Sequence, residues 1–178
     1  MKKVFLLACL SIVLFSSCSS NVDLAIDNPT KNSVEITIDT LTVMVPPKQV
    51  VWVEMGKGEH QIKLENDSII KYNFTESLYM VNPSLSEYLM YEEYYGTEMY
   101  KQFYRSSISK KTVSFLGIEF EGNYNVIKDV INKVTWDYGP RESLPEMVQV
   151  ESGESFTTLI KLYDPREFVD LMQSSSGE

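Results

Sequence analysis

Apolar and polar residues alternate along the chain between Leu24 and Phe74. A repeat of two is typical of strands that bury one face, and turn-forming residues such as Asn28-Pro29 and Gly56-Lys57-Gly58 separate the alternating segments. The segments expected to form strands are Leu24–Ile26, Val34–Ile38, Leu41–Val45, Val51–Met55, His60–Leu64 and Ile69–Phe74. Short strands at this spacing predict a small β-sandwich over residues 24–75.

The pattern is mixed after residue 75. Val113–Phe120 alternates again and predicts a strand, whereas the apolar residues of Val126–Val134 recur every three or four positions and predict a short helix. Trp136–Pro145 contains prolines and a glycine and predicts an ordered loop that its aromatic residues hold in place. Val148–Leu162 predicts a hairpin that turns at Ser152-Gly153.

A last helix is expected near the end of the chain. Asp164 is a residue that caps helices well, and Pro165 suits the first helical position. The side chains expected to face the core are Phe168, Leu171 and Met172. Residues 174–178 are expected to form a flexible tail.

Tyrosine is concentrated in one stretch, because eight of the eleven tyrosines fall between Tyr72 and Tyr104. Ser84–Met90 could begin a helix, with Ser84 as its cap and Glu87 three residues later. The same residues are also compatible with a strand, since tyrosine favours sheets. The pattern leaves both structures open for this stretch.

The expected fold is therefore mainly β. A β-sandwich at 24–75 would be followed by a tyrosine-rich, mixed β/α part at 76–173 with short helices. The alternative is a single α+β domain, because no linker divides the two parts.

The chain begins with the features of a secretory signal peptide. Lys2 and Lys3 precede an apolar run, Val4–Phe15, which is shorter than the roughly 20 residues that cross a bilayer as a helix. Two serines then lead to Cys18. This arrangement resembles the lipobox of bacterial lipoproteins, a family in which a diacylglycerol is attached to the cysteine thiol and the chain is cut before it. The resemblance implies a signal peptide at 1–17, a lipid on Cys18 and a tether at 18–23.

The residues after Cys18 bear on where such a lipoprotein would be placed. No aspartate follows the cysteine directly, so the inner-membrane retention signal of enteric bacteria is missing. The acidic cluster that resembles a surface-export signal is missing as well. The expected location is the Gram-negative cell envelope, on the outer membrane facing the periplasm, with surface exposure as the alternative.

Charge and cysteine content fit this location. The formal charge is −9, and it becomes −11 when Lys2 and Lys3 leave with the signal peptide, which disfavours binding to nucleic acid. Membrane attachment would therefore depend on the lipid. Cys9 also leaves with the signal peptide, so the mature chain would have no free thiol and no disulfide. The expected partners are the membrane, through the lipid, and an envelope protein or a glycan.

A second resemblance concerns the predicted sandwich. It rests on an Asn28-Pro29-Thr30 turn, a strand ending in Val45-Pro46-Pro47 and the pattern Gly58-x-His60-x-Ile62. These residues resemble the Ig-like and PEGA-type β-modules of bacterial envelope lipoproteins. The resemblance implies a spacer or adhesive module and brings no catalytic residue with it.

Few residues suggest catalysis. His60 is the only histidine, its sequence neighbours would face away from it, and a zinc site of His and Cys ligands lacks the residues it needs. Glu119 and Glu121 would share one strand face, which a solvated surface explains better than glycoside hydrolysis. No cofactor motif is present, so we expect no catalytic residue, metal or cofactor.

The main hypothesis is a non-enzymatic, lipid-anchored envelope protein. A glycan-binding lipoprotein is the first alternative, in which a platform of tyrosines stacks on sugars near Glu92-Glu93. The candidate contact residues are Tyr88, Tyr91, Tyr94 and Tyr95. A carboxylate-dependent hydrolase is the disfavoured alternative, and it would need two acids in one cleft, one of them with a raised pKa.

Overall fold

The computed structural model describes residues 21–108, 110–151 and 153–175, and the fold is mainly β, as predicted. The first strands are β1 Asn21–Asn28, β2 Val34–Ile38, β3 Leu41–Val45, β4 Gln49–Gly56, β5 Gly58–Leu64, β6 Ile69–Phe74 and β7 Leu78–Val81. The later strands are β8 Tyr88–Gly96, β9 Lys111–Phe115, β10 Ile118–Gly122, β11 Tyr124–Ile127, β12 Ile131–Lys133 and β13 Phe156–Tyr163. The helices are α1 Glu98–Ser107 and α2 Pro165–Ser175.

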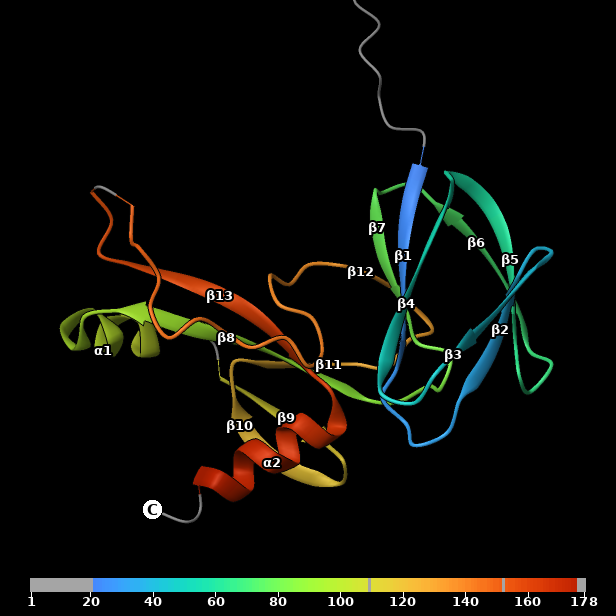
Figure 1. Ribbon diagram of the computed structural model, residues 1–178. Coiled ribbons are helices and arrows are strands. Elements are labelled where there is room, and N and C mark those ends of the chain that lie inside the picture. The colour runs from blue at the N-terminus through green and yellow to red at the C-terminus, as the bar shows by residue number, and fades with distance from the viewer. Residues whose placement is uncertain (1–20, 109, 152, 176–178) are drawn as a thin grey trace, which may run out of the picture.

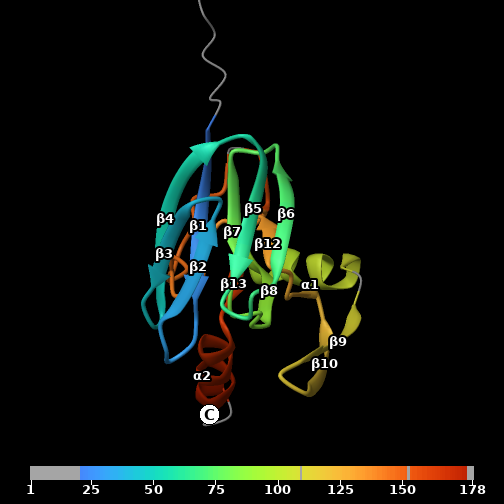
Figure 2. The ribbon, with the colours of Figure 1, turned by 90° about the vertical axis from the view of Figure 1, so that its right-hand side faces the viewer.

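Two four-stranded sheets pack face to face and form a β-sandwich (Figure 2). One sheet has the strand order β3-β2-β5-β6, and the other has the order β12-β7-β1-β4. We call the second one the central sheet, because it has further structure on its other face. In the central sheet β1 runs antiparallel to β4 and parallel to β7.

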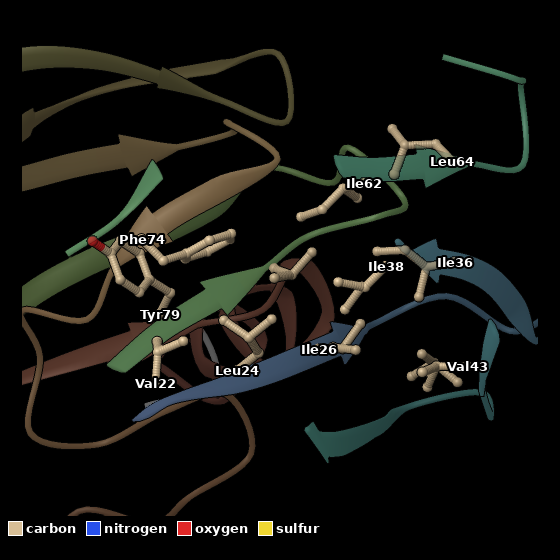
Figure 3. Packing of buried hydrophobic residues seen from close by; sticks show 12 residues of the cluster. Val22, Leu24, Ile26, Ile36, Ile38, Val43, Ile62, Leu64, Phe74 and Tyr79 are labelled. Atoms are coloured by element: carbon tan, nitrogen blue, oxygen red, sulfur yellow. The ribbon is translucent and has the colours of Figure 1, made fainter. Parts of the chain in front are cut away.

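The sandwich core follows from the alternation in the sequence. Val22, Leu24 and Ile26 of β1 point toward the facing sheet and are completely buried (Figure 3). They meet Ile36 of β2 and Ile62 of β5, which are buried to the same degree. Each such side chain contributes about 1.5–3 kcal/mol when it leaves water, so this core is the main source of stability for the sandwich.

A third sheet, with three strands in the order β11-β8-β13, lies beside the sandwich (Figure 1). Because side chains alternate along a strand, β8 contributes to two small cores. Tyr88 packs with Met80 of the central sheet and Leu162 of β13, whereas Leu89 packs with Phe115 of β9 and Phe168 of α2. The three-stranded sheet is thus covered by the central sheet on one face and by α2 and the β9–β10 hairpin on the other.

The sandwich draws strands from both predicted parts of the chain. β7 and β12 lie within the segment 76–173, yet they complete the central sheet, where Ile131 pairs with Val81. At the other end, Asn21–Asp23 belongs to β1 and pairs with β4, although these residues were expected to be part of the tether. The sheets therefore do not follow the boundaries expected from the sequence.

Several predicted elements differ from those observed. Val126–Val134 forms strand β11, a loop and strand β12 instead of a helix, because its β-branched residues pair with β8 and β7. Val113–Phe120 is not one strand but the two strands of a hairpin, which turns at Leu116-Gly117 with φ values of 53° and 77°. Only the second half of the predicted hairpin at Val148–Leu162 is a strand, β13, and it pairs with β8.

The open question at Ser84–Met90 is resolved in favour of a strand. The side chain of Asn82 is completely buried, and its carbonyl oxygen accepts hydrogen bonds from the hydroxyl of Ser84 and the backbone N–H of Ser86. These hydrogen bonds close a turn, and strand β8 begins after it at Tyr88. The side chain of Asn82 thus provides the local hydrogen bonds that a helical turn would otherwise supply.

The last helix begins as predicted. Asp164 Oδ1 accepts hydrogen bonds from the backbone N–H groups of Arg166 and Glu167, and the Glu167 carboxylate accepts one from the backbone N–H of Asp164. This reciprocal pair is a capping box. Phe168 faces the core, but Leu171 and Met172 are about half exposed, contrary to the expectation. Neither helix in the described part of the chain is long and apolar enough to span a membrane.

Candidate functional site

Charged side chains meet inside the protein where the central sheet, the three-stranded sheet and α2 come together. Asp27 of β1 accepts a hydrogen bond from the hydroxyl of Tyr88 at 2.5 Å and forms an ion pair with Arg141. The same guanidinium donates to Asp164, the cap of α2, at 2.8 Å. We call these four residues, Asp27, Tyr88, Arg141 and Asp164, the ion network. It connects segments that are 61 and 114 residues apart in the sequence.

Burial shapes the electrostatics of the ion network. The pKa of Asp27 is raised because desolvation outweighs the hydrogen bond from Tyr88 and the charge of Arg141. The pKa of Tyr88 is raised for the same reason, and the neighbouring carboxylate of Asp27 adds to the effect. Both oxygens of Asp27 are occupied, one by Tyr88 and one by Arg141. Asp27 therefore has a perturbed pKa but no oxygen free to exchange a proton with a substrate.

A buried lysine lies next to the ion network. The ammonium of Lys161 donates to the backbone carbonyl of Gly139 at 2.6 Å and pairs with Glu167 at 3.1 Å. Its pKa is lowered, chiefly by desolvation. These bonds attach the loop after β12 to β13 and α2, so Lys161 acts as an anchor for that loop.

A pocket of about 200 Å³ opens on the outer face of the central sheet, beside the ion network. Its floor is formed by the face of the sheet that points away from the sandwich core, where Ala25 pairs with Trp52. Its wall is the loop 134–142, which lies along β13 because Asp137 and Tyr138 donate their backbone N–H groups to the carbonyl of Ile160. The apolar side chains that line it include Val50, Trp52, Leu78, Met80, Val134 and Trp136. We call this the tryptophan pocket.

The polar side chains of the tryptophan pocket are all acidic. Asp27, Asp137 and Glu142 contribute to its lining, and no lysine or arginine is among the described residues that do. Asp137 accepts a hydrogen bond from the backbone N–H of Ile160, and Glu142 accepts one from Gly139. Asp137 and Glu142 are exposed, so both keep their carboxylates in contact with solvent at the rim.

The four tyrosines predicted as ligand contacts do not share one surface. Along β8, Tyr88 and Tyr94 point to one face of the sheet, whereas Tyr91 and Tyr95 point to the other. Tyr88 is completely buried and Tyr94 is 9% exposed. These two are core side chains.

The other two predicted tyrosines are half-buried and already have partners. Tyr91 stacks on Tyr124 with ring centroids 5.0 Å apart, and the hydroxyl of Tyr95 donates to the carbonyl of Pro145 at 2.8 Å. Near Tyr91, a hollow of about 320 Å³ is lined by Tyr94, Tyr104, Tyr124 and charged residues. The rings there pack mainly against one another.

The single histidine has partners that its sequence neighbours did not indicate. His60 Nδ1 lies 2.7 Å from a carboxylate oxygen of Asp39, and Nε2 lies 2.8 Å from the backbone carbonyl of Gly56. His60 is therefore oriented by Asp39, which is 21 residues away in the sequence, and not by its immediate neighbours. Each ring nitrogen thus faces an oxygen of the protein itself, so neither is turned toward a side chain that could act as a nucleophile.

The remaining acidic candidates are dispersed. Glu119 and Glu121 are exposed on β10, as expected for a solvated strand face. Glu92 accepts a hydrogen bond from the side chain of Asn123 at 2.8 Å, next to the tyrosine-lined hollow. Within residues 21–108, 110–151 and 153–175, no group of three or more His, Cys, Asp or Glu side chains is arranged to hold a metal ion. Cys18 and the predicted signal peptide lie outside the described residues.

The ion network and the tryptophan pocket are the two features that sequence patterns missed. Arg141, Trp52 and Trp136 belong to segments whose partners are distant in the chain, and no local motif marks them.

A scan of the chain against models of known protein families finds no match, and neither a search of curated proteins nor a search of solved structures finds a similar protein.

Proposed function

We propose that this chain is a lipid-anchored protein of the cell envelope that acts by binding and not by catalysis. Its lipid would be attached to Cys18 after removal of residues 1–17. The observation that carries the proposal is the start of the fold, because β1 begins at Asn21, three residues after Cys18. Cleavage before Cys18 would remove none of the elements that the structure describes.

This short distance supports a particular orientation of the protein on the membrane. Three residues span at most about 11 Å, so a lipid on Cys18 would hold the first residue of β1 close to the bilayer surface. Asn21 pairs with Gly56, and β7 begins next to Asp23. The β4–β5 turn and the segment before β7 would therefore lie near the membrane, whereas α2 lies at the opposite end of the molecule in both views (Figures 1 and 2).

The chemistry of the described residues favours binding. Both nitrogens of His60 and both oxygens of Asp27 are engaged in contacts within the protein. An acid or base that catalyses a reaction needs an atom within reach of the substrate. The tryptophan pocket, in contrast, presents indole rings and exposed carboxylates without a nucleophile beside them.

Metabolic labelling with an alkyne analogue of palmitate tests the anchor. The wild-type protein should take the label and fractionate with membranes, and Cys18→Ala should lose both properties. Cys9→Ala is the matched control, because Cys9 would leave with the signal peptide, so this variant should behave like the wild type. A Cys18→Ala protein that keeps the label and stays with the membrane would disprove the proposal.

A further inference from the structure

We infer that the tryptophan pocket binds a small quaternary ammonium group, such as the trimethylammonium head of choline. The inference rests on the two indoles, the acidic rim and the shortage of free acceptors inside the pocket. It does not depend on whether Cys18 is lipidated.

The indole rings provide the first part of the argument. The side chain of Trp52 is 61% exposed although it lies in the middle of β4, opposite Ala25. Trp136 faces the same pocket from the loop after β12 and is half-buried. Tryptophan is the ring that attracts cations most strongly, and paired aromatic walls are the usual means of binding methylated ammonium groups.

Charge provides the second part. Asp137 and Glu142 at the rim take part in none of the ion pairs found among the described residues. The two cations beside the pocket are paired with other carboxylates, the guanidinium of Arg141 with Asp27 and Asp164 and the ammonium of Lys161 with Glu167. Asp23 and Glu54 lie opposite each other on the same outer face of the sheet, next to the Ala25–Trp52 pair. The pocket thus lies in a field of negative charge, which favours a cation and opposes an anion.

The interior of the pocket selects the type of cation. A primary ammonium has three N–H donors, and each needs an acceptor when water is removed. The deepest carboxylate, Asp27, already accepts from Tyr88 and Arg141, and the other inner walls are apolar side chains. A quaternary ammonium carries the charge without any donor, so it suits these walls better.

The size of the pocket limits the ligand. A volume of about 200 Å³ holds only a small group. A cavity of about 150 Å³ holds a benzene ring, so the pocket has room for a group of about six to eight heavy atoms. We therefore expect the pocket to take the head group of a ligand and to leave any longer portion outside.

Tryptophan fluorescence offers a direct test, because the chain has two tryptophans and both line this pocket. The full-length protein, in non-ionic detergent, is titrated with choline, tetramethylammonium, butylammonium, glucose and the neutral tert-butyl analogue of choline. Choline and tetramethylammonium should change the emission saturably, with a dissociation constant on the order of 1 mM, as expected for so few ligand atoms. Butylammonium and the neutral analogue should bind at least about fivefold more weakly, because each lacks one feature that the pocket selects.

Substitutions separate the contributions of the indole ring and of the rim carboxylates to choline binding. Trp52→Ala should weaken choline binding about tenfold, and the emission of the remaining tryptophan, Trp136, measures that binding. The double variant Asp137→Asn, Glu142→Gln should weaken it about fivefold, since the amides keep the hydrogen bonds to Ile160 and Gly139 but lose the charge. The matched control is Glu119→Gln, Glu121→Gln on the exposed β10, which removes the same charge far from the pocket and should bind choline like the wild type.

Three results would overturn the inference. The first is equal binding of choline and its neutral analogue, which would mean that the pocket recognises shape alone. The second is saturable binding of glucose with no response to either quaternary cation, which would indicate a sugar site. The third is the absence of any saturable change with choline while circular dichroism shows a folded protein.

Discussion

The hydroxyl of Tyr88 on β8 donates to the carboxylate of Asp27 on β1 at 2.5 Å, inside the protein. This hydrogen bond crosses from the three-stranded sheet to the central sheet of the sandwich. Arg141 and Asp164 extend it to the loop after β12 and to α2. A buried carboxylate is tolerated only when its partners are in place, so this contact makes the two sheets depend on each other.

Removal of Arg141 tests this dependence. Arg141→Ala should lower the free energy of unfolding by about 3 kcal/mol, because it leaves Asp27 buried beside a single neutral donor. Urea denaturation followed by circular dichroism measures the loss. The control is Arg166→Ala, whose ion pair with Asp170 is exposed, so the change there should stay below about 0.5 kcal/mol. Equal effects of the two variants would contradict the importance of the ion network.

Asp164 performs two tasks that a pair of substitutions can separate. Its Oδ1 caps α2, and its Oδ2 accepts from Arg141. Asp164→Asn keeps an oxygen for the cap but loses the ion pair, whereas Asp164→Ala loses both. The alanine variant should be less stable than the asparagine variant by about 1 kcal/mol, the usual value of an N-cap. The same denaturation assay compares them, and identical stabilities would mean that the cap is dispensable.

Two half-buried tyrosines predict a loss of stability in alkali. Burial raises the pKa of Tyr104 and of Tyr163 to about 12, above the ordinary value of 10.0. A group whose pKa is higher in the folded state stabilises that state fully below its unfolded pKa. That stability is lost as the pH rises through the folded pKa. The free energy of unfolding should therefore fall between about pH 10 and pH 12.

The other titrating group to consider in this pH range is Lys161, and substitutions of the tyrosines provide the test and its control. Lys161 has a lowered pKa and acts in the opposite direction, but its effect is complete below its ordinary value of 10.5. Tyr104→Phe and Tyr163→Phe should each reduce the alkaline loss in urea titrations, and Tyr100→Phe, on the exposed side of α1, is the matched control. A wild-type protein that keeps its full stability throughout this range would refute the prediction.

The β9–β10 turn requires a conformation that glycine adopts easily. Gly117 has a φ of 77°, and a Cβ there would meet no atom within 4 Å, so strain alone decides the effect of a substitution. Gly117→Ala should cost about 1 kcal/mol in thermal or urea unfolding. Gly56→Ala, which also has open space but no positive φ, should be neutral within about 0.5 kcal/mol. A neutral Gly117→Ala would show that the turn is not strained.

The proposed anchor predicts an orientation on the membrane. Lys57 lies in the β4–β5 turn near Asn21, and Lys31 lies in the β1–β2 turn at the other end of the sandwich. The mature chain would have no other free thiol, so Lys57→Cys and Lys31→Cys can each carry a single fluorophore. A quencher placed in the lipid headgroups should quench the label at position 57 much more than that at position 31. Equal quenching would argue against a short tether.

The alternation of apolar and polar residues was sufficient to predict those strands that bury one face against the other sheet. Ile36, Ile38 and Ile62 occupy the core positions that their alternation predicts. The cap at Asp164 was also visible, because every atom of that motif comes from neighbouring residues. The pattern failed at Val126–Val134, where helical spacing coexists with β-branched residues and tertiary pairing decided the outcome.

The candidate site was less predictable for a physical reason. Asp27 and Arg141 are 114 residues apart, and nothing near either residue indicates the other. The two tryptophans likewise come from β4 and from the loop after β12, and only the folded central sheet brings them to one pocket. The concentration of tyrosines in the sequence suggested a ligand-binding platform, whereas in the fold several of these side chains fill the cores beside the three-stranded sheet.

The position of β12 in the central sheet has a consequence for the order of folding. The edge beside β7 stays open until residues 131–133 arrive, so a chain that is synthesised from its N-terminal end cannot complete the sandwich while those residues are still inside the ribosome. During that interval β7 presents unpaired backbone groups, which can associate with other chains. A fragment that ends at Val81 would keep this open edge permanently, and one that ends at Phe74 would lack β7 as well and leave the edge of β1 open.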